Sequence, residues 1–408
     1  MVSAMRNLVG LGTALGLVLA AAPPAIAALP DCSTLPDPIY LQVGDTQVSL
    51  MKALGRKLRD NTPKPLTLIW ASTGSCTNIA TTYGRAKIST GLAMSYAPSI
   101  AEDPNFITGD TAPQCAYTVP VYVDIGNSAL FTSACTTDPA PGSVALTLGP
   151  RQGYVLAMPK GTDQTAITAE EAYFLFGFGP TLLAAMGAAI APWTDEAQLA
   201  LRTATKSTLL AWAANLTVPA AKWHGIRNDT STQVVSALTG SSNPTASIGI
   251  LGSEVADGLR GSLTVLAFRA FGQYAAYYPD STVSSRDKRN LRDGHYTVWS
   301  PTVWMDYITS GTPAKPDARY VIDLIAGHEV TPAPNFDANV VVASVGLTPD
   351  CAMRVQRSFE GGPLSLYRPA TSCTCKFEAT VDVSTCATCS ASAPCASGVC
   401  RAGFCEEF

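Results

Sequence analysis

The sequence is poor in charge and in histidine. Only 14% of its 408 residues are Asp, Glu, Lys or Arg, it has three histidines, and its formal net charge is −4. The lack of clustered positive charge argues against a nucleic-acid-binding protein or one that coats anionic lipid. Three histidines leave little room for a His-rich metal enzyme, and we expect no metal and no cofactor.

The common catalytic motifs are also missing. No G-x-S-x-G, H-E-x-x-H or P-loop pattern occurs. An S-x-x-K at Ser49–Lys52 and an S-x-N at Ser241–Asn243 resemble two motifs of penicillin-recognising acylases, but no Lys-Thr-Gly follows them. The sequence therefore predicts a protein that is not an enzyme.

The first 27 residues have the pattern of a secretory signal peptide. Arg6 supplies the positive charge, 8–22 is apolar, and Ala25-Ile26-Ala27 is a cleavage box of small residues. The apolar run is too short for a bilayer, and no later run of 18 apolar residues appears. We expect a periplasmic or secreted protein with no membrane span in the mature chain.

The 12 cysteines are unevenly distributed, and seven of them lie after residue 372. In an exported chain they favour disulfides, with zinc as the alternative for Cys373-x-Cys375 and Cys386-x-x-Cys389. Cys115 with Cys135, and Cys32 with Cys76, are plausible pairs, although spacing does not determine connectivity. We interpret 351–408 as a separate disulfide-stapled tail.

Between residues 38 and about 350, β-prone runs alternate with helical patterns. The runs lie at 39–43, 66–71, 117–124, 154–158 and 223–227. This order predicts an α/β fold in two lobes, each with a mostly parallel sheet covered by helices. A capping box starts a helix after Thr168, and Ser231 is expected to cap another helix.

Three polar loops each follow a predicted strand and precede a predicted helix, at 44–47, 72–75 and 228–232. In a parallel sheet such loops gather at the carboxyl ends of the strands, where helix N-termini can bind an anion. Arg227 adds a guanidinium that can hold two oxygens of an oxyanion. Taken singly, each loop is more typical of a simple helix cap than of an anion site.

A basic run at 286–292 stands out in this acidic chain. It is interpreted either as a solvated loop or as a contact with an anionic surface or partner.

From Ile39 to about Ile308 the chain resembles the substrate-binding proteins of phosphate ABC transporters. Six short motifs in the order of that family carry the resemblance: Ser72-Thr73-Gly74-Ser75, Val123-Asp124-Ile125-Gly126-Asn127-Ser128, Ile167-Thr168-Ala169-Glu170-Glu171 with Phe176-Gly177, Trp193-Thr194-Asp195-Glu196-Ala197, Arg227-Asn228-Asp229-Thr230-Ser231 and Ser247-Ile248-Gly249-Ile250.

The resemblance implies a two-lobed type II periplasmic-binding-protein-like fold with a small disulfide-rich C-terminal appendage. Lobe I would comprise 28–151 and 259–350, and lobe II 152–258. The family's ligand-binding residues carry over to Asp45, Thr46, Ser72, Thr73, Gly74, Ser75, Ser128, Arg227 and Ser231.

Two positions depart from the family pattern. Ala129 stands where the family has an aspartate that accepts a phosphate proton, and Thr232-Gln233 replace Gly-Thr. We therefore expect an exported binding protein that holds a small oxyanion, phosphate or a related ion, between its lobes, with a membrane transporter as a possible partner. The alternative is a surface or interaction protein that has kept the fold and binds no solute.

Overall fold

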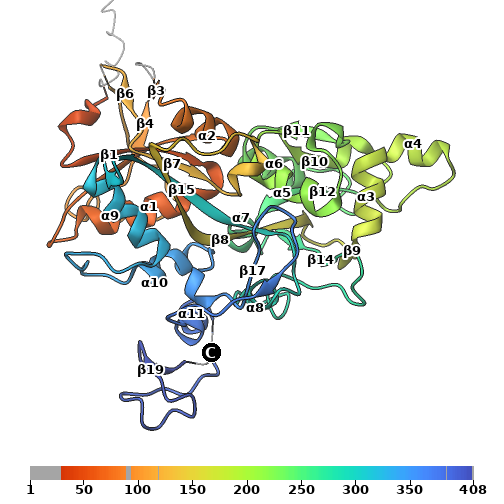
Figure 1. The fold of residues 1–408 in the computed structure, drawn as a ribbon. Helices are drawn as coiled ribbons and strands as arrows, with labels where there is room; N and C mark the ends of the chain where they lie inside the picture. The colour runs from red at the N-terminus through yellow and green to blue at the C-terminus, as the bar shows by residue number, and fades with distance from the viewer. Residues whose placement is uncertain (1–28, 89–92, 118, 383, 407–408) are drawn as a thin grey trace, which may run out of the picture.

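The computed structural model describes residues 29–88, 93–117, 119–382 and 384–406 (Figure 1). The predicted signal peptide, 1–27, lies outside the described residues. Within them, no helix is both long enough and apolar enough to cross a bilayer.

Two long antiparallel strands, β8 (Val144–Pro159) and β15 (Trp299–Thr309), pass through the middle of the molecule. They join the parallel strands of two lobes into one twelve-stranded sheet, whose order is β11-β10-β12-β8-β15-β7-β1-β2-β4-β5. Strands β13 and β16 (Thr312–Pro313) branch from β8 and β15. Figure 1 shows the two lobes on either side of this pair.

Lobe I is built from two separate stretches of chain around one apolar core. Its strands β1, β2 and β7 are parallel, with Gly44 opposite Thr73 in the register of β1 and β2. The strands and helices are β1 (Pro38–Gly44), α1 (Val48–Arg59), β2 (Thr67–Thr73), α2 (Ser75–Tyr83), β3 (Lys87–Ile88), β4 (Met94–Tyr96), β5 (Gln114–Cys115), β6 (Val121–Tyr122), β7 (Ile125–Ser128), α9 (Pro316–Ala326) and α10 (Ala338–Ser344).

Lobe II surrounds a second core, which continues past residue 258 and includes Leu263, Phe268 and Trp299. Its strands β10, β11 and β12 are also parallel. The strands and helices are β9 (Ala166–Thr168), α3 (Ala169–Phe178), α4 (Pro180–Ala185), β10 (Leu199–Arg202), α5 (Ser207–Leu216), β11 (Ile226–Asn228), α6 (Ser231–Thr239), β12 (Ile248–Gly252), α7 (Ser253–Gly258), β13 (Leu263–Val265), β14 (Ala267–Arg269) and α8 (Arg289–Asp293).

Helix α3 begins as the sequence predicts, with a capping box between Thr168 and Glu171. The prediction for α6 was wrong by one residue, because Thr230 is the cap and pairs with Gln233 in a second capping box. Ser231 is instead the first residue of the helix, so its backbone N–H is free to bind a group outside the helix.

All 12 cysteines form disulfides, which are typical of exported proteins. Both pairings suggested from spacing were wrong, since the structure joins Cys32 to Cys115 and Cys76 to Cys135. The first pair lies in a small apolar cluster beside β2, and the second ties the chain after β7 to α2. The partners are 83 and 59 residues apart in sequence and meet only through the tertiary fold.

The C-terminal region after residue 350 holds the other four disulfides, 351–373, 375–386, 389–400 and 395–405. Its elements are β17 (Val355–Gln356), β18 (Ser365–Leu366), α11 (Thr374–Val381), β19 (Cys400–Arg401) and β20 (Phe404–Cys405). The α/β architecture with a disulfide-rich C-terminal region confirms the predicted fold class. The first half of this region packs into the body, since Met353 and Val355 belong to the core of lobe II.

Two basic residues of the run, Lys288 and Arg292, point inward, whereas Arg286 and Arg289 are exposed. The Lys288 ammonium lies 2.6 Å from Asp257 Oδ2 and 2.8 Å from Asp280 Oδ1, and Arg260 pairs with the same two carboxylates. Arg292 is buried against Glu378 of α11. The two inward residues neutralise acids within the protein, which neither interpretation of the sequence anticipated.

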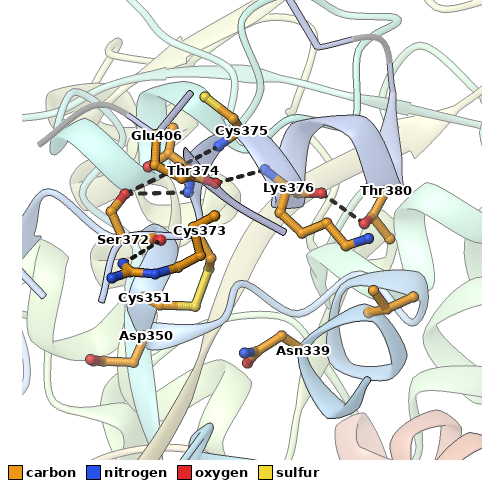
Figure 2. The surroundings of a disulfide bond; sticks show 12 residues. Asn339, Asp350, Cys351, Ser372, Cys373, Thr374, Cys375, Lys376, Thr380 and Glu406 are labelled. Atoms are coloured by element: carbon orange, nitrogen blue, oxygen red, sulfur yellow. Dashed lines mark hydrogen bonds between the residues drawn. A yellow bond between two sulfur atoms is a disulfide. The ribbon is translucent and has the colours of Figure 1, made fainter. Parts of the chain in front are cut away.

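One carboxylate holds the end of the chain against α11. The fully buried Glu406 accepts hydrogen bonds from the backbone amides of Cys375 (3.1 Å) and Lys376 (3.1 Å) and from the Ser372 hydroxyl (3.2 Å), as Figure 2 shows. A carboxylate at a helix N-terminus satisfies amides that have no partner within the helix and is favoured by the helix dipole.

We expect Glu406→Ala to lower the free energy of unfolding by about 2–3 kcal/mol, because two buried amides lose a charged acceptor. Urea denaturation of the oxidised protein measures this change. The exposed Glu329 provides the matched control, and Glu329→Ala should leave the stability unchanged. Equal stability of the two variants would contradict the capping role of Glu406.

Candidate functional site

The carboxyl ends of the parallel strands of both lobes meet at the lobe junction. The loop after β1 comes from lobe I and the start of α6 comes from lobe II, and the two touch directly. Of the three polar loops predicted to gather, the structure thus brings 44–47 and 228–232 together. The third, 72–75, faces lobe II through Gly74, where an added Cβ would lie 3.4 Å from the carbonyl oxygen of Thr205.

The centre of the junction is a contact between Asp45 of lobe I and two residues of lobe II. Asp45 Oδ2 accepts hydrogen bonds from the backbone N–H and the hydroxyl of Ser231, each at 3.0 Å. The same oxygen lies 2.8 Å from Arg202 Nη2. One carboxylate oxygen therefore receives three donors, one of them charged, which is the environment that an oxyanion ligand requires.

Arg202 is the functional candidate that the sequence reasoning missed. Its side chain is 0% exposed, and Nη1 donates to Ser231 Oγ at 2.7 Å. Nη2 and Nε donate to the backbone carbonyls of Asp229 (2.8 Å) and Asn228 (3.3 Å). The available signal was a charged residue at the end of the otherwise apolar strand Leu199–Arg202.

Arg227, the predicted source of positive charge, has other partners. Its guanidinium donates to the backbone carbonyls of Arg202 (3.3 Å), Ala220 (3.0 Å) and Trp223 (2.8 Å). Burial lowers the pKa of Arg227. The structure places this side chain where it ties β11 to the preceding turn, and its binding role stays a prediction.

The predicted hydroxyl donors of lobe I make their hydrogen bonds within lobe I. Thr46 Oγ1 accepts from Gln47 at 3.4 Å, and Thr73 donates to Asn78. Ser75 Oγ accepts from the amide of Ala129 at 3.1 Å, and Ser128 Oγ donates to the carbonyl of Leu130 at 2.8 Å. Ser72, which precedes Thr73 on β2, is exposed. These side chains shape the loops around Asp45.

Next to Asp45, the polar side chains of Gln47, Gln152 and Glu254 form a hydrogen-bonded chain. Gln47 Nε2 donates to Gln152 Oε1 at 3.0 Å, and Gln152 in turn donates to Glu254. Burial raises the pKa of Glu254 to about 8, and the nearby Asp45 and Asp257 charges add to the rise. Below that pH the junction therefore holds a neutral Glu254 beside the charged Arg202–Asp45 pair.

A second acid, the half-buried Glu360, lies at another edge of the junction. Glu360 Oε1 accepts a hydrogen bond from the Ser300 hydroxyl on β15 at 2.7 Å. Burial raises the pKa of Glu360 to about 7, against the opposing effects of Ser300, Arg357 and the backbone amide of Phe131. Two carboxyls with raised pKa values thus lie where the lobes meet.

Comparisons with known proteins give structural likeness only. No protein-family model matches the chain, and no curated protein matches it by sequence. Among solved structures, a Clostridium perfringens protein described as a phosphate ABC transporter substrate-binding protein with bound phosphate is 13% identical, covering 77% of this chain and 99% of its own, with a TM-score of 0.49.

Two further structures show the same range of likeness. An ABC-type phosphate transport receptor from Vibrio cholerae is 12% identical, covers 76% of this chain and 99% of its own, and has a TM-score of 0.46. The reduced OxyR regulatory domain from Pseudomonas aeruginosa is 9% identical, covers 70% and 92%, and has a TM-score of 0.38. At these values the function must be argued from the site itself.

We expect Glu254→Gln to reduce the loss of stability as the pH rises toward 8. A carboxyl whose pKa is about 8 in the folded state and 4.5 ordinarily keeps its proton in the folded state after the unfolded chain has lost it. Stability therefore falls as the pH rises between those values. From about pH 5 to about pH 8 the native protein should lose up to about 1.4 kcal/mol per pH unit more than the variant.

Urea denaturation of both proteins across this range measures the difference. Glu329→Gln, a change at an exposed carboxyl, should follow the native protein. A parallel pH dependence of native protein and Glu254→Gln would show that Glu254 is not protonated at neutral pH.

Proposed function

We propose that this protein is an exported solute-binding protein that holds a small oxyanion, phosphate or a related ion, between its two lobes. The observation that carries the proposal is the triple contact on Asp45 Oδ2, where the carboxylate oxygen stands in for an oxygen of the ligand. In this arrangement Arg202 supplies the positive charge, and the N-terminus of α6 with Ser231 supplies two further donors.

An incoming anion would take the place of the Asp45 carboxylate. Asp45 is 22% exposed and lies in the short 3-10 turn Asp45–Gln47, so its side chain can turn toward solvent. Arg202 is held by two backbone carbonyls and stays in position. The ligand and the Asp45 carboxylate are thus alternative partners of one set of donors. Hinge movement about β8 and β15 would give the ligand access.

The proposal retains the other residues carried over from the family resemblance as ligand-binding candidates around this centre. Export is supported by six disulfides, which persist in oxidising compartments. A membrane transporter is the partner that the resemblance implies.

We expect Arg202→Ala to abolish anion binding, because the charge and the support of Ser231 are lost together. Isothermal titration calorimetry of the oxidised protein with inorganic phosphate, sulfate and a short phosphonate measures this. Arg227→Ala is the matched comparison, since that guanidinium donates to three backbone carbonyls. Loss of binding in Arg227→Ala but not in Arg202→Ala would assign the charge to Arg227 and contradict the proposed centre.

We expect Asp45→Ala to tighten anion binding, because the variant removes the competing carboxylate and its repulsion. A charge-assisted hydrogen bond contributes about 1.5–3 kcal/mol, so the affinity should rise at least about tenfold. The same titrations measure this effect. Weaker binding in Asp45→Ala would show that Asp45 holds the ligand and does not compete with it.

A second function is favoured by the same contact. If Asp45 is a permanent partner of Arg202 and Ser231, the lobes are joined by an internal ion pair, and the protein serves as a surface or interaction protein without a solute. Absence of heat and of a thermal shift with all three anions, in native protein and in Asp45→Ala, would favour this function.

A further inference from the structure

The C-terminal region sends a hairpin to the junction between the lobes. Strands β17 and β18 pair antiparallel, with Val355 opposite Leu366. In Figure 1 the blue segment that carries β17 lies over the middle of the molecule, between the two lobes. Glu360, whose carboxyl accepts the Ser300 hydrogen bond, lies in the turn between the two strands.

The base of the hairpin is anchored in lobe II. Val355 belongs to the core of that lobe, and Leu364 packs against the core. The Arg357 guanidinium lies 4.3 Å from the ring centre of Trp299 and donates to the carbonyl of Thr297 at 2.8 Å. These contacts hold both strands of the hairpin against one lobe.

The tip of the hairpin contacts the other lobe and the crossing strand. Glu360 Oε1 accepts the hydrogen bond of Ser300 on β15 at 2.7 Å, and the backbone amide of Phe131 in lobe I lies near enough to its carboxylate to lower the pKa. Phe359 and Glu360 line a hollow of about 360 Å³ together with Ser133 of lobe I and residues of α5 in lobe II. The chain around Phe131 is part of lobe I because Cys135 is joined to Cys76 on α2.

A glycine brings the tip close to α5. Gly361 has φ +69°, and an added Cβ would lie 2.9 Å from the carbonyl oxygen of Ala214. Only a residue without a side chain fits both this conformation and this distance. The turn therefore packs directly against α5.

The hairpin also lies inside a closed covalent loop. Cys351 and Cys373 form a disulfide whose loop contains both strands, and the amide of Cys373 donates to the carbonyl of Cys351 at 3.0 Å (Figure 2). Asp350, next to this disulfide, pairs with Arg151 on β8. The ends of the hairpin are thus fastened to the body beside the crossing strand.

We propose that the hairpin 355–366 is a strap that limits the opening of the two lobes. It is fixed to lobe II at its base, and its tip is hydrogen-bonded to β15 and lines one hollow with Ser133 of lobe I. Separation of the lobes about β8 and β15 requires the tip to leave either the Phe131 segment or α5. The strap acts on this movement whether or not the protein binds an anion.

Hydrogen–deuterium exchange of the intact, oxidised protein tests the proposal without any ligand. Gly361→Ala places a methyl group against Ala214, and Gly272→Ala is its matched control, because Gly272 has φ +79° and nothing within 4 Å of an added Cβ. Gly361→Ala should speed amide exchange about tenfold in 129–135 and in 207–216, and Gly272→Ala should not change it there.

Ser300→Ala is the second variant, since it removes the hydrogen bond at the tip without altering the backbone of the strap. It should speed exchange in the same two segments, which a general loss of stability would not single out. Native exchange in both segments in Gly361→Ala and in Ser300→Ala, or equal effects of Gly361→Ala and Gly272→Ala, would overturn the proposal.

Discussion

The antiparallel pairing of β8 with β15 is the constraint on which the rest of the structure depends. Each lobe has its own apolar core and its own parallel strands, and only this pair of strands carries the sheet from one to the other. The pairing sets which strand ends face each other, and it places Gln152 of β8 and Ser300 of β15 at the junction. Both polar contacts behind the junction are built on these two side chains.

The junction holds few charged groups because its surroundings are buried. One guanidinium, Arg202, meets one carboxylate, Asp45, and the two nearby acids Glu254 and Glu360 have raised pKa values. Burial disfavours the charged form of both acids more than Gln152 beside Glu254, or Ser300 and Arg357 beside Glu360, can offset. The proposed competition between the Asp45 carboxylate and an external oxyanion fits a junction suited to one negative charge at a time.

The C-terminal region has two parts that pack differently. Its first part packs on both lobes through the strap and through α11, where Phe377 joins an apolar cluster with Ala343 of α10. Its last part is a small disulfide-linked unit that Glu406 fastens to α11. The cysteines stabilise a region with little apolar area of its own, and the structure confirms the disulfides that the sequence indicated there.

Sequence alone determined the α/β class, the disulfide-rich end and the helix start at Thr168, because these depend on local periodicity, composition and short-range hydrogen bonds. It also placed Asp45 and Ser231 in polar loops that follow strands. The tertiary structure decided that Arg202 rather than Arg227 contacts them, that Cys32 pairs with Cys115, and that Lys288 and Arg292 of the basic run face inward. These outcomes depend on which strands become neighbours, and that order follows from packing across the whole sheet rather than from any local pattern.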